Sequence, residues 1–301
     1  MIKYNQLLNK SILLALVTFF YISNLFAVAD FIIFSYDRPM QLYALLESTE
    51  RYLTGIDSTT IICRSSNKRF TDAYTIVQKR FPDVRFLFQS NNPHEDFKPL
   101  VMRSFNENAS PYVIFAPDDI IVKNYADLKT CATAAQKHNA YGFFLRLGTH
   151  LNASYSFAQP QPIPPLTAID NNMLIWTFKD STTKFDWGYP NNVDMTLYLK
   201  SDIQQSLQTH SFSSPNTMEA SWAGAQGPFL QRTGLCFTDS VIVNIPVNCV
   251  QHDYLNNQMH SWTPQQLLEL FEAGQKIDIE PLAGIQNKSC HINYDLTFTT
   301  R

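Results

Sequence analysis

Two adjacent carboxylates, Asp118 and Asp119, follow an apolar run in the segment PYVIFAPDDIIV. Such a run is typical of a buried strand, and α/β folds bind their ligands beyond the carboxyl ends of parallel strands. Paired carboxylates repel one another, which favours a bound divalent cation, and their oxygen atoms suit Mg²⁺ or Mn²⁺. Such an ion would stabilise a departing nucleoside diphosphate. The competing interpretation is a turn or helix cap, because Asp pairs are common after strands.

Two further carboxylates are candidates for a general base: Glu219 in NTMEASW and Asp194 in YPNNVDMTLY. A base of this kind must lie within hydrogen-bond reach of the hydroxyl that it deprotonates. The spacing also allows a structural interpretation, in which Glu219 completes a capping box begun by Asn216 and Asp194 is a turn carboxylate. Both interpretations remain open at this point.

The elements that would position these residues follow an alternating pattern after Asp30. Short apolar runs alternate with amphipathic stretches, which indicates βαβ units, an α/β fold and a mostly parallel sheet flanked by helices. The expected strands are FIIF, STTIIC, VRFLF and PYVIF, and the expected helices are MQLYALLESTERYL, TDAYTIVQKRF, FKPLVMRSFNEN and NYADLKTCATAAQKH.

The pattern is less regular in the second half of the chain. YGFFLRL, NMLIWTF and residues 240 to 246 read as strands, KSDIQQSLQ as a helix and AQPQPIPPL as an extended loop, because its prolines forbid a helix. The helix PQQLLELFEAG has a complete set of end signals, with Thr263 as N-cap, Gln266 for a capping box and Gly274 as the stop.

Residues 1 to 29 are expected to act in export. Lys3 and Lys10 precede the apolar run SILLALVTFFYISNLF, and the small residues AVA end at Ala29, which is the order of a secretory signal cleaved there. The alternative is a retained membrane anchor through residues 12 to 29, because about 20 apolar residues span a bilayer. The protein is therefore expected to be exported, as a periplasmic, secreted or lumenal protein.

The composition excludes some partners. The chain has 23 basic and 26 acidic residues and a net charge of -3, with no basic block, so nucleic acid is not an expected partner. Its five cysteines occur singly, without metal-ligand spacing, and leave one or two disulfides open.

The order of strand ends resembles the nucleotide-binding half of GT-A glycosyltransferases. The loops SYDRP, CRSS and QSNN follow the first three strands and APDD follows the fourth; the family's first strand often ends in T-Y-N-R-P and its fourth in D-x-D or D-D-D. Ala116 stands where the family usually has its first acidic residue. Later segments, including WGYPNNVD, SPNTMEAS and NIPVNCVQ, are similar to recurring stretches of uncharacterised bacterial GT-A-like proteins.

The resemblance implies specific roles for several residues. It implies a metal site in which His291, from SCHINYDLTF, joins Asp118 and Asp119. Residues in the loops that face this edge are candidates for binding the nucleotide and its diphosphate, with Arg38 foremost: Tyr36, Asp37, Arg38, Arg64, Lys98, Arg103 and Arg146. Four aromatic residues are candidates for a sugar-stacking platform or for buried core: Trp176, Trp187, Tyr189 and Trp222.

These observations predict one GT-A-like domain over residues 30 to 301, with a nucleotide-sugar-binding half (30 to 125) and an acceptor-side half (126 to 301). The expected reaction is metal-assisted transfer of a sugar from a nucleotide-diphosphate sugar to the hydroxyl of a glycan or other acceptor. The alternative is a catalytically inactive, exported GT-A-fold module that binds glycans, motivated by the missing acid at Ala116.

Overall fold

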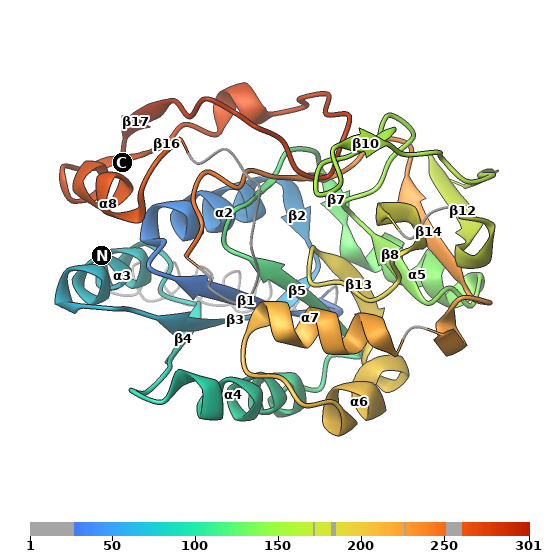
Figure 1. Cartoon of the computed structure of the whole chain (residues 1–301), viewed down its shortest axis with the longest axis horizontal. Helices are drawn as coiled ribbons and strands as arrows, with labels where there is room; N and C mark the ends of the chain where they lie inside the picture. Colours follow the sequence, from blue (N-terminus) through green and yellow to red (C-terminus); the bar gives the residue numbers. More distant parts are fainter. Residues whose placement is uncertain (1–26, 171, 182–184, 226, 251–260) are drawn as a thin grey trace, which may run out of the picture.

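The computed structural model describes residues 27–170, 172–181, 185–225, 227–250 and 261–301. It shows a central sheet with helices on both faces (Figure 1), so the predicted Rossmann-type α/β class is confirmed. The strands follow one another across the sheet in this order: β11 (Thr167–Ile169), β12 (Met173–Thr177), β14 (Thr233–Phe237), β8 (Gly142–Phe144), β13 (Thr196–Leu199), β5 (Tyr112–Pro117), β1 (Ala29–Tyr36), β3 (Ile56–Arg64) and β4 (Arg85–Phe88).

The strands predicted from the first half of the sequence form the parallel part of the sheet. β1 pairs in parallel with β3 and β5, and β3 pairs in parallel with β4. Their carboxyl ends therefore meet at one edge. β13 joins this part antiparallel to β5, and the sheet beyond it is mixed.

Helices cover both faces of the sheet (Figure 1). One face packs against α2 (Pro39–Tyr52), α3 (Lys68–Arg80), α5 (Leu128–Lys137) and α8 (Pro264–Glu272). The other packs against α4 (Pro93–Glu107), α6 (Lys200–Thr209) and α7 (Pro215–Gly224). The predicted capping box of α8 is confirmed, and α4 begins at Pro93, before the expected FKPL, because Pro93 takes a first-turn position where no N–H is needed.

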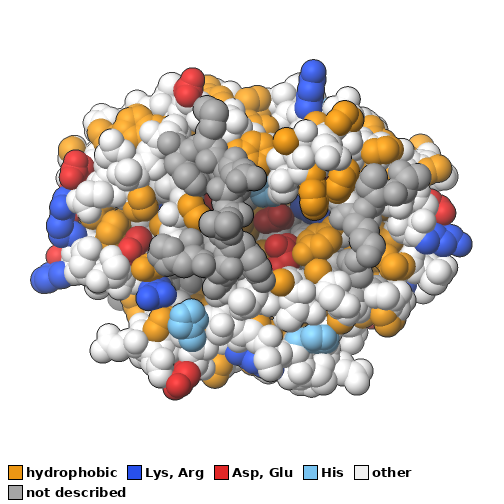
Figure 2. Space-filling view, viewed as in Figure 1, with side chains coloured by type: hydrophobic (Ala, Val, Ile, Leu, Met, Phe, Trp, Pro, Cys, Tyr) orange, Lys and Arg blue, Asp and Glu red, His pale blue; other side chains and the backbone are white. Residues whose placement is uncertain are grey.

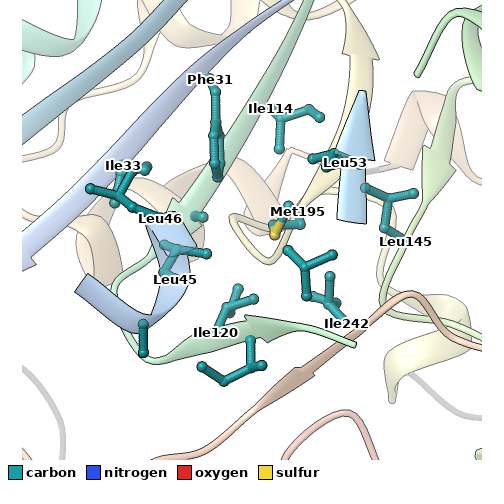
Figure 3. Packing of buried hydrophobic residues seen from close by; sticks show 14 of the residues in the cluster. Phe31, Ile33, Leu45, Leu46, Leu53, Ile114, Ile120, Leu145, Met195 and Ile242 are labelled. Carbon is teal, nitrogen blue, oxygen red and sulfur yellow. The ribbon is translucent and has the colours of Figure 1, made fainter. Parts of the chain in front are cut away.

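Buried hydrophobic side chains fill both sides of β1. Phe31 and Ile33 pack toward α2 with Leu45, Leu46 and their neighbours (Figure 3), whereas Ile32 and Phe34 pack toward α4. Because successive side chains of a strand point to opposite faces, burial of all four shows that both faces are covered. Because helices pack on both faces, the carboxyl end of β1 is held in place at the edge of the sheet.

Short strand pairs attach the C-terminal part of the chain to the sheet edge. β6 (Ile120–Val122) pairs antiparallel with β15 (Ile242–Asn244), and Asn244 forms a further bridge with His291. The remaining short elements are β2 (Leu53–Thr54), β7 (Ala126–Asp127), β9 (Ala153–Ser154), β10 (Gln159–Pro160), β16 (Gln275–Ile277), β17 (Phe298–Thr300), η1 (Phe178–Asp180), η2 (Asp186–Gly188), η3 (Gly227–Phe229) and η4 (Glu280–Leu282). Asn244 thereby lies beside Ile120, the residue that follows Asp119, and His291 lies beside Asn244.

Most of the expected export segment, residues 1 to 26, lies outside the described residues, so export and membrane anchoring stay predictions. The described part of the chain contains no helix that is long and apolar enough to cross a membrane. The cleavage point expected after Ala29 falls inside β1, where Ala29 is fully buried and its N–H donates to the carbonyl of Gly55 at 3.3 Å. Cleavage of the peptide bond after Ala29 would remove this core residue from β1.

Four of the cysteines, Cys63, Cys131, Cys236 and Cys290, are buried free thiols. They pack as small apolar groups, so the disulfides left open by the sequence do not form among them. Burial also raises the pKa of each of these thiols, which keeps them protonated at neutral pH.

Candidate functional site

A cavity of about 640 Å³ lies at the carboxyl edge of the parallel strands; we call it the edge cavity. It is formed by the ends of β1, β3 and β5, the loop before β13, the start of α7 and the segment after β15. Figure 2 shows acidic side chains in a hollow near the middle of the molecular face that it displays. Its volume is in the range of small-molecule sites. Eight residues predicted from the sequence line it: Tyr36, Arg38, Arg64, Asp118, Asp119, Asp194, Glu219 and His291.

Asp118 and Asp119 form a charged cluster with Arg38. Nη1 of Arg38 donates to Oδ1 of Asp118 at 3.0 Å and to Oδ2 of Asp119 at 3.2 Å. The other oxygen of Asp118, Oδ2, accepts from the hydroxyl of Ser35 at 2.7 Å. The side chains of Arg38 and Asp118 are only 10% and 3% exposed, so this is a desolvated cluster and not a surface ion pair.

The backbone after β15 holds Arg38 from its other side. Nε donates to Oδ1 of Asn248 at 2.7 Å, and Nη2 donates to the Asn248 backbone carbonyl. The left-handed φ of 52° at Asp37 turns the chain between β1 and α2, immediately before Arg38. The guanidinium is therefore fixed between two segments that lie far apart in the sequence.

Burial sets the proton affinities of the cluster. Burial alone would lower the pKa of Arg38, but the carboxylates of Asp118 and Asp119 raise it, so the guanidinium stays charged. Burial also raises the pKa of Asp118 to about 6, with Arg38 opposing this effect and Asp119 adding to it. Asp118 is thus ionised at neutral pH and takes up a proton in mild acid.

The predicted metal ligands do not fit a divalent cation in this arrangement. Both oxygens of Asp118 and one of Asp119 already accept hydrogen bonds from Arg38 or Ser35. Oδ1 of Asp119 is buried and has no hydrogen-bond partner among the described residues. His291 lines the same cavity, yet in the described part of the chain no three Asp, Glu, His or Cys residues form a group that could hold a metal.

Ala116 does not leave a gap in this site. It lies in β5 opposite Ile33, is fully buried and packs in the core on the α2 side. An acid at this position would be buried among hydrophobic residues. The departure from the family pattern at Ala116 therefore does not remove a carboxylate from the edge cavity.

A second pair of carboxylates, Asp194 and Glu219, lies elsewhere in the lining of the edge cavity. Helix α7 starts at Pro215 with Ser214 as its cap and Thr217 as the capping-box partner. The alternative interpretation of Glu219 as a capping residue for Asn216 is therefore wrong. Glu219 instead accepts a hydrogen bond at Oε1 from the N–H of Val193 at 3.2 Å, next to Asp194.

The two carboxylates are electrostatically coupled. Burial and the neighbouring Asp194 raise the pKa of Glu219 to about 8. Burial also raises the pKa of Asp194, whereas His291 and Arg146 lower it. Because two close carboxylates do not both ionise readily, the pair holds a proton near neutral pH. A carboxyl pair of this kind can accept a proton from, or donate one to, a bound ligand.

Several residues predicted to bind the cofactor lie away from the edge cavity. Lys98 donates to the carbonyls of Gln208 and His210 at 2.9 and 2.6 Å, so it ties α4 to the end of α6. Arg103 is further along α4 and pairs with Glu107 at 2.6 Å. Neither residue is among the described residues that line the edge cavity, and their contact with the diphosphate stays a prediction.

Arg146 and Asp37 have structural partners as well. Arg146 is buried and pairs with Asp186 at 2.7 Å, and Asp37 accepts a hydrogen bond from the N–H of Ser66 at 2.8 Å. Burial raises the pKa of Asp37, while Ser66 and Arg64 oppose this effect. These two side chains shape the loops of the site and do not line the cavity.

Aromatic residues divide between core and cavity. Trp176, Trp187 and Trp222 are at most 2% exposed and belong to the core, so they form no sugar platform. Tyr36 does line the edge cavity, with the Arg64 guanidinium carbon 4.5 Å from the centre of its ring. This pair offers a flat cationic surface on which a planar ring can stack.

Sequence reasoning missed two residues that build the charged cluster, Ser35 and Asn248. Asn248 belongs to NIPVNCVQ, a segment noted for its family similarity. The sequence therefore marked this segment, but it did not show that Asn248 binds Arg38. Ser35 directly precedes Tyr36 at the strand end, and only the pairing of β1 with β5 places it beside Asp118.

Comparison with known proteins supports a relationship to glycosyltransferases. No protein-family model matches the chain. Over 191 residues the chain is 28% identical to the bifunctional glycosyltransferase pgtA of Dictyostelium discoideum, a match that covers 58% of this chain and 24% of that protein. The chain thus spans about a quarter of that relative's length. This homology confirms the resemblance stated from the motifs.

Solved structures with a related arrangement are more distant. S. aureus TarS 1–349 in complex with UDP is 13% identical, with a TM-score of 0.45 over 71% of this chain and 59% of that one. CMP:2-keto-3-deoxy-manno-octonic acid synthetase complexed with CTP is 12% identical, with a TM-score of 0.38 over 70% of this chain and 89% of that one.

Proposed function

We propose that this chain, a homologue of a glycosyltransferase, transfers a sugar from a nucleotide-diphosphate sugar to the hydroxyl of a glycan or other acceptor. One observation carries the proposal: the edge cavity brings the fixed guanidinium of Arg38 together with the coupled carboxylates Asp194 and Glu219. A leaving diphosphate needs positive charge, and an attacking hydroxyl needs a base. The cavity has both.

The donor would lie along the ends of β1, β3 and β5. Tyr36 and Arg64 would provide a surface for the nucleobase, and the guanidinium of Arg38, which lines the same cavity, would donate to the diphosphate. The volume of about 640 Å³ accommodates a ligand of this size. The nucleobase and the sugar are left open by these contacts.

The acceptor would enter from the side of Asp194 and Glu219. Its hydroxyl oxygen forms the new bond to the anomeric carbon of the sugar while the bond from that carbon to the diphosphate oxygen breaks. The electron pair leaves with the nucleoside diphosphate, and the hydroxyl proton passes to whichever carboxylate of the pair is ionised. This assignment corresponds to inversion at the anomeric carbon.

An inactive glycan-binding module is less well supported. Its motivating observation was Ala116, and that residue lies in the core outside the cavity. Burying two coupled carboxylates also costs stability that simple glycan binding does not require. Perturbed carboxylates in a cleft are more typical of catalysis.

The proposal is tested by donor binding and turnover. Purified protein is titrated calorimetrically with a panel of UDP- and GDP-sugars, and release of nucleoside diphosphate is followed with glycan acceptors. Asp194→Asn is expected to bind the donor normally and to lose turnover by about 100-fold or more, the usual contribution of a general base, because Glu219 holds the proton of the pair near neutral pH. Arg103→Gln, outside the cavity, serves as the matched control. If no donor binds to the unmodified chain, the proposal fails.

A further inference from the structure

The charged cluster at Asp118 and Asp119 has little room for a second cation. Of the four carboxylate oxygens, Oδ1 of Asp118 and Oδ2 of Asp119 face Nη1 of Arg38, and Oδ2 of Asp118 faces Ser35. The last, Oδ1 of Asp119, is buried. A divalent cation needs several oxygen ligands at once, so it would first have to remove Arg38.

Arg38 is held too firmly to leave easily. Besides the two carboxylates, it donates through Nε to the side chain of Asn248 and through Nη2 to that residue's backbone carbonyl. Moving the guanidinium would break its hydrogen bonds to both carboxylates and leave two Asn248 acceptors unpaired. The arrangement therefore favours the arginine over a metal at this position.

We propose that the guanidinium of Arg38 takes the place of a divalent cation in this chain and is itself the positive charge that contacts the donor diphosphate. The inference rests on the proposed function and adds a metal-independent donor site to it. The contacts above engage Nε, both hydrogens of Nη1 and one hydrogen of Nη2, while the residue still lines the edge cavity. The second hydrogen of Nη2 has no hydrogen-bond partner among the described residues and would donate to a diphosphate oxygen.

The chemistry of this arrangement is simple. When the bond between the anomeric carbon and the diphosphate oxygen breaks, the electron pair remains on the diphosphate, and Arg38 stabilises that charge by a charge-assisted hydrogen bond. No proton moves to or from the guanidinium, which stays charged throughout. Asp118 and Asp119 keep the guanidinium in position and do not contact the donor.

The first test uses the unmodified chain and two simple probes. Mn²⁺ alone is titrated into chelator-treated protein and followed by electron paramagnetic resonance, and inorganic pyrophosphate is titrated calorimetrically in EDTA and in Mn²⁺. We expect no saturable Mn²⁺ binding below about 1 mM and equal pyrophosphate affinity in both buffers. Saturable Mn²⁺ binding that is lost in Asp119→Asn, or pyrophosphate binding that requires Mn²⁺, would overturn the inference.

The second test replaces the arginine. Arg38→Gln keeps a side chain of similar reach without the charge, and we expect it to weaken pyrophosphate binding by about 100-fold or more and to gain Mn²⁺ binding at the vacated carboxylates. Arg103→Gln is expected to change neither. Unchanged pyrophosphate affinity in a folded Arg38→Gln protein contradicts the inference, and if this variant does not fold, the titrations of the unmodified chain still decide.

The outcomes also separate this inference from the proposed function. Pyrophosphate binding in EDTA together with no turnover of any sugar donor would sink the transferase proposal and leave the role of Arg38 intact. Donor turnover that stops when metal is removed would support the transferase proposal and overturn the inference about Arg38.

Discussion

The raised pKa of Glu219 predicts a gain in stability when its charge is removed. A carboxyl whose pKa rises from 4.5 to about 8 is destabilised in its charged form by roughly 5 kcal/mol, because each tenfold step in acidity corresponds to about 1.4 kcal/mol. Glu219 shares its proton with Asp194 and is partly exposed in the cavity, and these two effects reduce the difference to about 2 kcal/mol. Glu219→Gln keeps Oε1 as the acceptor for the N–H of Val193 and removes only the charge.

The sign and pH range of this effect follow from linkage. Between pH 4.5 and about 8 the folded protein holds the Glu219 proton while the unfolded chain releases it, so the stability of the unmodified protein falls as pH rises through this range. The Gln variant lacks that dependence, and its advantage should grow from near zero at pH 4.5 to about 2 kcal/mol above pH 8.

Urea denaturation of both proteins, measured from pH 4.5 to 9, tests this reasoning. Glu107→Gln is the control, because the pKa of exposed Glu107 is lowered by hydrogen bonds from Arg85 and Arg103 and its loss should destabilise slightly at neutral pH. Parallel pH profiles for the unmodified chain and Glu219→Gln would refute the electrostatic account of the Asp194–Glu219 pair.

Four other substitutions probe the remaining structure. Ser35→Ala removes the 2.7 Å hydrogen bond to Asp118 and should cost about 2 kcal/mol at pH 7 and less below pH 6, as measured by denaturation at both pH values. Ala116→Asp should lower stability by about 3 kcal/mol or more without creating Mn²⁺ binding, because the new carboxylate is buried in the core; a stable, Mn²⁺-binding variant would be a contrary result. Ser214→Ala should cost about 1 kcal/mol and Asn216→Ala much less in thermal melts, because Ser214 is the helix cap.

Much of the fold follows from periodicity and end signals. The parallel strands and the helices between them are read from short apolar runs, and Pro39 and Thr263 mark helix starts as predicted. The carboxyl ends of parallel strands lie at the same edge of the sheet whatever their side chains are. It was therefore predictable that Asp118, Arg38 and Arg64 would line one cavity.

The contacts of individual side chains were not predictable in the same way. Arg38 was expected to face a diphosphate, but its partners include Asp118 and the distant Asn248, and that pairing depends on how the chain after β15 returns to the sheet edge. The partners of Lys98 and Arg103 were not predictable, because the sequence does not give the rotation of α4 about its axis. The cap of α7 was misplaced by two residues, since both Ser214 and Asn216 have suitable side chains.

A crystal structure of the chain soaked with a nucleoside diphosphate in the presence of EDTA tests the central claim most directly. The account predicts the diphosphate in the edge cavity, with one of its oxygens within hydrogen-bond distance of Nη2 of Arg38 and the base against Tyr36 and Arg64. A nucleotide bound outside the edge cavity, or one that appears there only when Mn²⁺ bridges it to Asp118 and Asp119, would contradict it.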